Sequence, residues 1–406
     1  MKNMELNNKK QVLIVGGGFG GVKCALTLSK DPNFKITLIS KSNNLTYYPL
    51  QYQRATSLGR VNSLIPLDEL FHNKNVKIIS EEVLSIDKVK QTIQTASKKE
   101  YSYDFIVFSL GTVTNDFHIP GVKEYAFDIK NDQSIKKFKE HIHEQVAKNH
   151  HLDQNYFVIG AGPTGLELAG NLTSLVKEIS KNHGVKQSHI NLTIIEASPR
   201  LLANLPIDSS RIISRRLKKL KIKIKLKSKL EMITDHSIIV NQKEYPSTSV
   251  LWAAGSKNNP FFENNNFTIT SRGKISVDAY LQTDRNIFVI GDNANTPYSG
   301  MAQTAIHDGE FVAKNLIRLI NRKELKSYKV KKTISVIPIG HKWAAMIWGE
   351  LRIYGYLGWL IRGIADLIGF HYLENWKQIS KQYIYRNEFD EDCPVCKIAE
   401  DANLLN

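Results

Sequence analysis

The chain has 406 residues, of which 42% are hydrophobic and 23% charged, a balance typical of a globular protein with two or three domains. Its three cysteines (Cys24, Cys393 and Cys396) are too few for a disulfide scaffold. No run of about 18 apolar residues occurs, which excludes a simple membrane-spanning helix, and the apolar run near the start is too short for a signal peptide. We therefore expect a protein of the cytoplasmic compartment.

The formal net charge is +16, with basic residues concentrated over 208–229 and 318–386. Such clusters suit anionic partners, namely nucleotides, anionic lipid or nucleic acid. Because no basic and aromatic residues alternate at a spacing typical of nucleic-acid recognition, we expect no nucleic-acid binding. In the first cluster, Ile222, Ile224 and Leu226 alternate with lysines, which predicts a half-buried strand with a solvated face.

A strand over 12–15 runs into a glycine turn and then a helical pattern. Gly16, Gly18 and Gly21 fit the G-x-G-x-x-G spacing that lets a backbone approach a pyrophosphate at a helix N-terminus. The turn also contains Phe19 and Gly20, and a second strand leads to Ser40 and Lys41. An acid usually ends this strand, but the Ser40 hydroxyl can still bond a ribose as a neutral partner.

A second turn of the same kind contains Gly160, Gly162 and Gly165, again between a strand and a long helix. The next strand ends at Glu196, whose carboxylate can accept both ribose hydroxyls and would repel a 2′-phosphate, so NADH is favoured over NADPH. Two such turns about 140 residues apart predict two bound dinucleotides.

A later strand, 287–290, leads to Asp292, whose carboxylate can bind a ribityl hydroxyl of a flavin. A helix is predicted to begin near Ala302 or Gln303, with its N-terminus facing the flavin. Strand-to-glycine crossings at Gly111 and Gly255 suit a chain that passes between two domains.

The expected fold is α/β with two Rossmann-like domains: a discontinuous FAD domain (1–120 and 266–332), an inserted NAD(H) domain (121–265) and a C-terminal region (333–406).

These motifs resemble those of type II NADH dehydrogenases, which are NADH:quinone oxidoreductases with two dinucleotide-binding domains. The resemblance covers roughly 10–370 and rests on VGGGFGG with TYYPLQYQRATSLG, GAGPTGLELAG, IGD at 290–292 and MAQTAIHDGE. It implies a non-pumping enzyme that binds FAD and NADH and is attached to the membrane surface. It also implies that Ala302 and Gln303 lie beside the flavin at the quinone pocket, and that Glu167 lies near the nicotinamide–flavin contact.

The sequence departs from that family at Ser40, where an acid is usual, and at Asp308, where a second glutamine normally lines the quinone tunnel. A carboxylate beside an apolar quinone needs a partner or a proton. Related disulfide reductases carry a cysteine pair in the first helix, and sulfide:quinone relatives carry cysteines in mid-chain. Because this chain has neither, its flavin is expected to pass electrons on directly, and Cys24 is interpreted as a packed helix residue.

The segment 341–376 is rich in Trp and Tyr and is interrupted by Arg352, Arg362 and Asp366. It suits an amphipathic element at a membrane surface, with nearby lysines attracted to anionic lipid. The alternative is packing within the protein or in a homodimer.

The tail holds one C-x-x-C, Cys393 to Cys396, interpreted as an inert tail, half of a metal site or intersubunit link, or a redox dithiol. We assign no metal ligand.

The leading hypothesis is an FAD-dependent NADH:quinone oxidoreductase on the cytoplasmic face of the cell membrane. An alternative keeps FAD and NADH but reduces a small redox protein of the rubredoxin or ferredoxin type, for which the basic surfaces are suited. A third, non-enzymatic alternative uses the nucleotide fold as a sensor on a membrane or nucleic acid.

Overall fold

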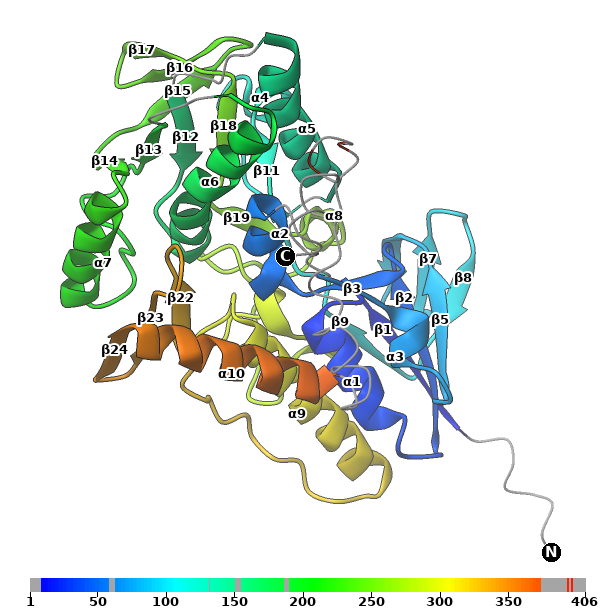
Figure 1. Ribbon diagram of the computed structural model, residues 1–406. Coiled ribbons are helices and arrows are strands. Elements are labelled where there is room, and N and C mark those ends of the chain that lie inside the picture. The colour runs from blue at the N-terminus through cyan, green and yellow to red at the C-terminus, as the bar shows by residue number, and fades with distance from the viewer. Residues whose placement is uncertain are drawn as a thin grey trace, which may run out of the picture.

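The computed structural model describes residues 9–57, 63–130, 132–149, 155–185 and 190–373, together with Cys393 and Cys396. Two largely parallel sheets with their own helices form its two main parts, and a third part, residues 335–373, lies across both (Figure 1). Trp376, which the sequence analysis placed in the surface element, lies outside the described residues.

The first sheet has six strands in the order β20-β21-β9-β1-β2-β5. Its strands are β1 (Lys10–Val15), β2 (Phe34–Ser40), β5 (Val76–Ser80), β9 (Phe105–Phe108), β20 (Gln282–Asp284) and β21 (Ile287–Val289). All pair in parallel except β20. The inner strands are apolar on both faces because helices α1 (Phe19–Leu28) and α9 (Ala302–Ile320) cover one face and a smaller sheet covers the other. The smaller sheet contains β6 (Val83–Asp87), β7 (Thr92–Thr95) and β8 (Glu100–Ser102).

The second sheet is parallel throughout, in the order β11-β18-β12-β13-β14. Its strands are β11 (Phe127–Asp128), β12 (Asn155–Ile159), β13 (Asn191–Ile195), β14 (Lys223–Lys225) and β18 (Ser249–Trp252). Helices α5 (Asp132–Asn149), α6 (Pro163–Asn182) and α7 (Ile207–Lys219) flank it, and a small antiparallel sheet packs nearby. That sheet contains β15 (Leu230–Ile233), β16 (Ser237–Val240) and β17 (Lys243–Pro246). The half-buried strand predicted in the first basic cluster is the edge strand β14.

Two chain segments connect the parts and lie side by side. β10 (Thr112–Thr114), just after Gly111, pairs antiparallel with β19 (Ser256–Asn258), just after Gly255.

The remaining short elements are β3 (Asn44–Thr46), η1 (Tyr48–Leu50), α2 (Gln51–Thr56), β4 (Leu64–Pro66), α3 (Leu67–Leu70), α4 (Val122–Tyr125), α8 (Pro260–Asn264) and η2 (Gly291–Asn293). The domain boundaries given above stay predictions.

The third part is a three-stranded antiparallel sheet followed by a helix: β22 (Ser335–Pro338), β23 (Ala344–Trp348), β24 (Leu351–Gly355) and α10 (Tyr356–Leu373). In Figure 1 this helix, drawn in orange, runs past α1 while β22 lies beneath α6. Among the described residues, none of the helices is both long enough and apolar enough to cross a bilayer. The α/β class predicted from the sequence is confirmed, and the strands expected before each glycine turn and before Asp292 are present.

Candidate functional site

The first glycine turn lies between β1 and α1 at the carboxyl edge of the six-stranded sheet. Gly16 has a φ of +114°, and a side chain there would collide with the carbonyl of Ser109. The hydroxyl of Ser109 accepts the N–H of Gly21 at 3.0 Å. A Cβ on Gly18 would meet nothing within 4 Å, and Gly18 gives α1 no side-chain cap. The turn thus presents open, uncapped backbone, which is what a phosphate-binding turn requires.

Ser40 and Lys41, both predicted to bind a nucleotide, differ in their positions. Ser40 is the last residue of β2, is 7% exposed, and its Oγ lies only 2.7 Å from where a Cβ on Gly17 would be. The Ser40 hydroxyl is therefore beside the glycine turn. Lys41 instead forms a surface ion pair with Glu82 at 2.9 Å. Phe19, the first residue of α1, is buried against Tyr47, with ring centroids 5.4 Å apart.

Asn293, next to Asp292, joins the two segments that connect the parts of the chain. Its amide oxygen accepts the N–H of Gly111 at 2.8 Å, and its amide nitrogen donates to the Gly111 carbonyl at 2.7 Å and to the side chain of Asn258 at 2.6 Å. Asp292 is half-buried, and its carbonyl accepts a hydrogen bond from Lys274. Burial lowers the pKa of Lys274, and the negative charge of Asp292 opposes that effect. Asp292 therefore lies just beyond the carboxyl edge of the six-stranded sheet, in a segment that hydrogen bonds from Asn293 and Lys274 hold in position.

The second glycine turn repeats the first at the five-stranded sheet. Gly160 has a φ of +102°, and a Cβ on Gly165 would collide with the Gly160 carbonyl. Gly162 is again open, with nothing within 4 Å of a Cβ. Glu196 follows β13 directly, and its carboxylate accepts the N–H groups of Ala161 at 2.6 Å and Ser198 at 2.8 Å. Glu196 thus lies against the turn, where the sequence predicted the nucleotide ribose. Gly255, also in this part, has a φ of +141° and packs near the ring of Phe117.

Helix α9 begins at Ala302, as predicted, and Gln303 is exposed in its first turn. The Gln303 amide makes two hydrogen bonds to the backbone of Ile334, donating to its carbonyl at 3.3 Å and accepting its N–H at 3.2 Å. Gln303 thus links the start of α9 to the chain entering β22. Its predicted contacts with flavin and quinone stay predictions.

Asp308 is fully buried on the inner face of α9. Its carboxylate accepts the N–H of Gly291 at 3.0 Å and the hydroxyl of Tyr328 at 2.6 Å. Burial raises the pKa of Asp308 to about 6, although both hydrogen bonds act in the opposite direction. The neighbouring His307 is not its partner and bonds to the carbonyl of Lys329 at 2.8 Å. The carboxylate that departs from the family pattern is therefore turned inward and paired, supporting the turn that carries Asp292.

Glu167, in the first turns of α6, faces a charged pair from the C-terminal helix. Its carboxylate lies 3.8 Å from Arg362, and Arg362 is bound at 3.1 Å to Asp366, one turn further along α10. The three side chains are only 13%, 12% and 5% exposed. Arg362 also donates to the carbonyls of Val336 and Pro49. One arginine therefore joins α6, β22 and the segment 47–56.

Burial raises the pKa of Glu167 to about 8, because the opposing attraction of Arg362 is weak at this distance and Asp366 repels a second negative charge. Burial would lower the pKa of Arg362, but Asp366, Tyr52 and Glu167 together raise it, so Arg362 stays positively charged. Glu167 is thus the member of the group that titrates near neutral pH. At pH 7 its carboxyl group keeps a proton that a solvent-exposed glutamate would have lost.

The segment 47–56 lies between the two glycine turns and α10. Tyr47 stacks on Phe370 of α10 with ring centroids 4.3 Å apart, and Arg362 lies over the ring of Tyr52 at 5.8 Å. Gln51 and Arg54 both contact Asp132 at the start of α5. The aromatic segment noticed in the sequence therefore joins the first sheet's core to α5 and α10.

The fold and these contacts define a class: oxidoreductases with two dinucleotide-binding folds, each with an open glycine turn at the carboxyl edge of a parallel sheet. The chain belongs to the pyridine nucleotide-disulphide oxidoreductase family, whose model matches residues 10–309. It is accordingly an oxidoreductase. It lacks the cysteine pair after the first glycine turn, because Cys24 is alone and buried in α1.

Similarity to individual proteins extends beyond the family model. The chain is 28% identical over 361 residues to a type II NADH:quinone oxidoreductase of Staphylococcus epidermidis, covering 82% of this chain and 88% of that one. It has the fold of NDH2 from Plasmodium falciparum in complex with NADH, with a TM-score of 0.82 at 18% identity over 94% of this chain and 100% of that one. The sulfide:quinone oxidoreductase of Aquifex aeolicus gives a TM-score of 0.77 at 18% identity, over 95% and 98%.

Sequence reasoning missed Arg362 and Asp366 as site residues, because it treated them as charges interrupting an anchor. A signal was present: an Arg and an Asp four residues apart in an otherwise apolar helix can pair on one face and turn inward. Asn293 and Ser109 carried no such signal, since their hydrogen bonds to Gly111, Asn258 and Gly21 arise only when the chain has folded.

Proposed function

We propose that the protein is an FAD-containing NADH:quinone oxidoreductase of the type II, non-proton-pumping kind. The observation that carries the proposal is the double role of α10. One face of this helix places Arg362 against Glu167, and the other face is exposed and apolar. An enzyme that reduces a lipid-soluble quinone needs its site next to a surface that lipid can cover, and α10 supplies such a connection. The similarity to type II enzymes over most of the chain supports the same activity.

The residues of the first glycine turn fit an FAD molecule, because Gly18 leaves open space before an uncapped helix. The proposed FAD-binding residues are Gly16, Gly18, Phe19, Gly20, Gly21, Ser40, Lys41, Gly111, Asp292, Ala302 and Gln303. Of these, Lys41 has the weakest support, since its ammonium group is paired with Glu82. The second turn fits NADH in the same way, with Gly160, Gly162, Gly165, Glu196 and Gly255 as the proposed contacts.

When bound, FAD would accept a hydride from NADH and supply two electrons to the quinone. The protein's own contribution is alignment, exclusion of water and control of a proton. Quinone reduction consumes protons, and the Glu167 carboxyl holds one up to a pH of about 8 because its pKa is raised by burial. We propose that Glu167 supplies this proton, with Arg362 and Asp366 as positioning residues that keep the carboxyl in place.

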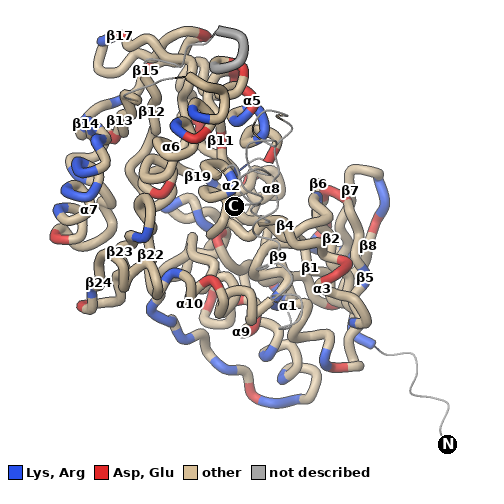
Figure 2. The backbone as a smooth tube through the Cα atoms, viewed as in Figure 1, with Lys and Arg blue, Asp and Glu red and all other residues tan. Residues whose placement is uncertain are grey.

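The membrane surface is the proposed partner of α10. Its exposed apolar side chains are Tyr356, Leu357, Trp359, Leu360, Ile364, Ile368 and Tyr372. Arg362 and Asp366 of this helix both turn inward, so its outer face is less charged than the sequence suggested. Five exposed lysines follow one another along the segment that leads from α9 into β22, the first strand of the sheet that precedes this helix (Figure 2). Apolar side chains beside lysines suit reversible attachment to anionic lipid, proposed here at the cytoplasmic face.

The test is an anaerobic absorption experiment on the purified protein. A bound flavin should be bleached by NADH and restored by a short-chain quinone. Gln303→Leu should slow the restoration by quinone and leave the bleaching by NADH nearly unchanged, because Gln303 lies at the start of α9 and not at the second glycine turn. If quinone fails to reoxidise the flavin while a ferredoxin or rubredoxin does so, the redox-protein alternative replaces the quinone proposal.

A further inference from the structure

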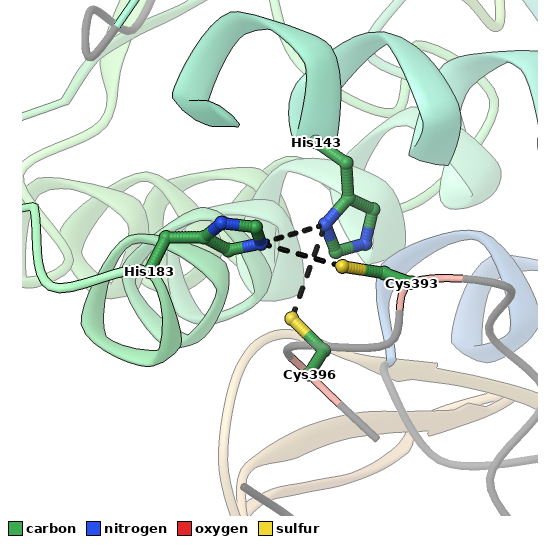
Figure 3. A group of neighbouring side chains, drawn as sticks. All are labelled: His143, His183, Cys393 and Cys396. Carbon is green, nitrogen blue, oxygen red and sulfur yellow. Dashed lines mark hydrogen bonds between the residues drawn. The ribbon is translucent and has the colours of Figure 1, made fainter. Parts of the chain in front are cut away.

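The C-x-x-C of the tail lies against two histidines from the helices that flank the second sheet. His143 is on α5, His183 follows the end of α6, and the side chains of Cys393 and Cys396 point toward both (Figure 3). The four possible ligand atoms, one from each residue, all lie within 4.8 Å of one another. Cys396 is fully buried, and the other three residues are half-buried. The sequence analysis assigned no metal ligand here because the two histidines are far from the cysteines along the chain.

Three distances among these ligand atoms are close to those in a tetrahedral site. Nδ1 of His143 and Nε2 of His183 are 3.4 Å apart, Sγ of Cys393 lies 3.4 Å from His183 Nε2, and Sγ of Cys396 lies 3.9 Å from His143 Nδ1. With zinc bonds of about 2.0 Å to nitrogen and 2.3 Å to sulfur, a tetrahedron places nitrogens about 3.3 Å apart and nitrogen and sulfur about 3.6 Å apart. A single ion between the four atoms would therefore need only small adjustments.

Hydrogen bonds among the four groups explain this geometry less well. Each of the two ring nitrogens faces both the other imidazole and a thiol. A ring nitrogen carries either one proton or one lone pair, so it serves one of its two neighbours at a time. One cation at the centre satisfies all four ligand atoms at once. The cysteines are free thiols, as a metal site requires.

We propose that His143, His183, Cys393 and Cys396 bind one Zn²⁺ in a closed Cys2His2 site. Two thiolates and two imidazoles in tetrahedral arrangement select zinc among the common divalent ions. Binding releases both thiol protons to solvent, and with four protein ligands no position is left for a substrate, so the role is structural. The site ties the tail to α5 and α6, across 210 positions of the chain between His183 and Cys393. It is separate from Glu167 and both glycine turns.

The experiment measures metal in the full-length, flavin-loaded protein purified without a metal-chelating tag. Elemental analysis should find about one zinc per chain, and the protein stripped with a chelator should take up one Zn²⁺ in competition with a chromophoric chelator. Cys393→Ser with Cys396→Ser should abolish this binding, as should His143→Ala with His183→Ala. Cys24→Ala and His72→Gln are the matched controls and should keep the zinc, since Cys24 is buried in α1 and His72 is exposed far from the cluster.

Co²⁺ substitution gives a second readout that does not depend on how the variants fold. The wild-type protein with Co²⁺ should show the visible absorption of a tetrahedral ion together with a sulfur-to-cobalt charge-transfer band. The proposal would be overturned by wild-type protein that neither contains zinc nor takes up Zn²⁺, or by a cysteine double variant that binds as much zinc as the wild type. Mass spectrometry that finds Cys393 and Cys396 joined in a disulfide after purification without reductant would also overturn it.

Discussion

Arg362 of α10 lies 3.8 Å from Glu167 of α6, although nearly two hundred residues separate them in the chain. The distance is long for an ion pair, and Arg362 is held more closely by Asp366 at 3.1 Å. Burial disfavours the ionised form of Glu167, and the attraction of the arginine offsets this effect only in part. The pKa of Glu167 therefore rises to about 8.

This raised pKa predicts a pH-dependent rate. Quinone reduction by the wild type should fall as pH rises through about 8, where Glu167 loses the proton it is proposed to supply. In Glu167→Gln that fall should disappear and turnover should drop by roughly 10²-fold, since the amide cannot give up a proton. Steady-state kcat between pH 6 and 10 checks this, with the exposed Glu263→Gln as control. An unchanged profile in Glu167→Gln would remove the carboxyl from proton transfer.

The same shift predicts a difference in stability. Because the folded-state pKa of Glu167 lies above its ordinary value of 4.5, its contribution to stability is full below about pH 4.5 and is lost as pH rises toward 8. The free energy of unfolding of Glu167→Gln, relative to wild type, should therefore increase across this range. Urea titrations at several pH values measure it, and a difference that is flat with pH would contradict the assignment.

Arg362→Met should be strongly destabilising, because it leaves Glu167 and Asp366 buried together without a positive charge. Breaking a buried pair in this way costs about 3–5 kcal/mol. Adding Asp366→Asn to Arg362→Met should recover part of the loss, since it removes the remaining buried charge next to the arginine position. Denaturant midpoints of the two variants check the order. A double variant less stable than Arg362→Met would show that Asp366 has another partner of greater importance.

Asp308→Asn should destabilise the protein by about 1–3 kcal/mol, because Gly291 and Tyr328 donate to different oxygens of the carboxylate and an amide has only one oxygen. It should also weaken retention of FAD, since Gly291 begins the turn that carries Asp292. Tyr328→Phe, which keeps the Gly291 contact, should have the smaller effect. Thermal melts and released flavin provide the measurement, and equal effects of the two variants would contradict this ranking.

Glu196→Ala should relax the preference for NADH over NADPH by roughly ten- to a hundredfold in the ratio of kcat/KM values, because the repulsion of a 2′-phosphate is lost. Glu196→Gln removes the negative charge but can retain an acceptor for the N–H of Ala161. It therefore distinguishes the effect of the charge on the 2′-phosphate from the effect of the hydrogen bond on the turn. Both variants should shift the ratio in the same direction. A wild type that uses NADPH as well as NADH would show that Glu196 does not read the ribose.

Membrane attachment is tested by charges on the outer face of α10. Leu357→Glu with Ile364→Glu should weaken binding to anionic vesicles by roughly 10²-fold, since both side chains are more than half exposed, at 63% and 55%. Val89→Glu, at a residue 94% exposed in the first sheet's part, is the control and should bind as wild type does. Vesicle flotation measures the difference. Equal binding of all three proteins would remove α10 as the attachment surface.

Local patterns were predictable from the sequence because strand, glycine turn and helix follow one another along the chain. Gly16 to Gly21 and Gly160 to Gly165 are found where that order placed them. The inward turn of Asp308 was not predictable, because it depends on which face of α9 packs and on Tyr328 arriving from a later segment. The contact between Cys393 and His183 depends on tertiary folding in the same way. The hydrophobic periodicity of the sequence does not predict contacts between residues so far apart in the chain.

The inward and outward faces of α10 belong to one rigid body, and this has a consequence for where the enzyme works. If α10 attaches to lipid as proposed, its release from the lipid would leave the helix freer to shift, and a shift would carry Arg362 away from Glu167 and from the carbonyls at Pro49 and Val336. On this proposal the membrane would act as an activator of the enzyme, and protein released into solution, away from lipid-soluble quinone, would be reoxidised slowly.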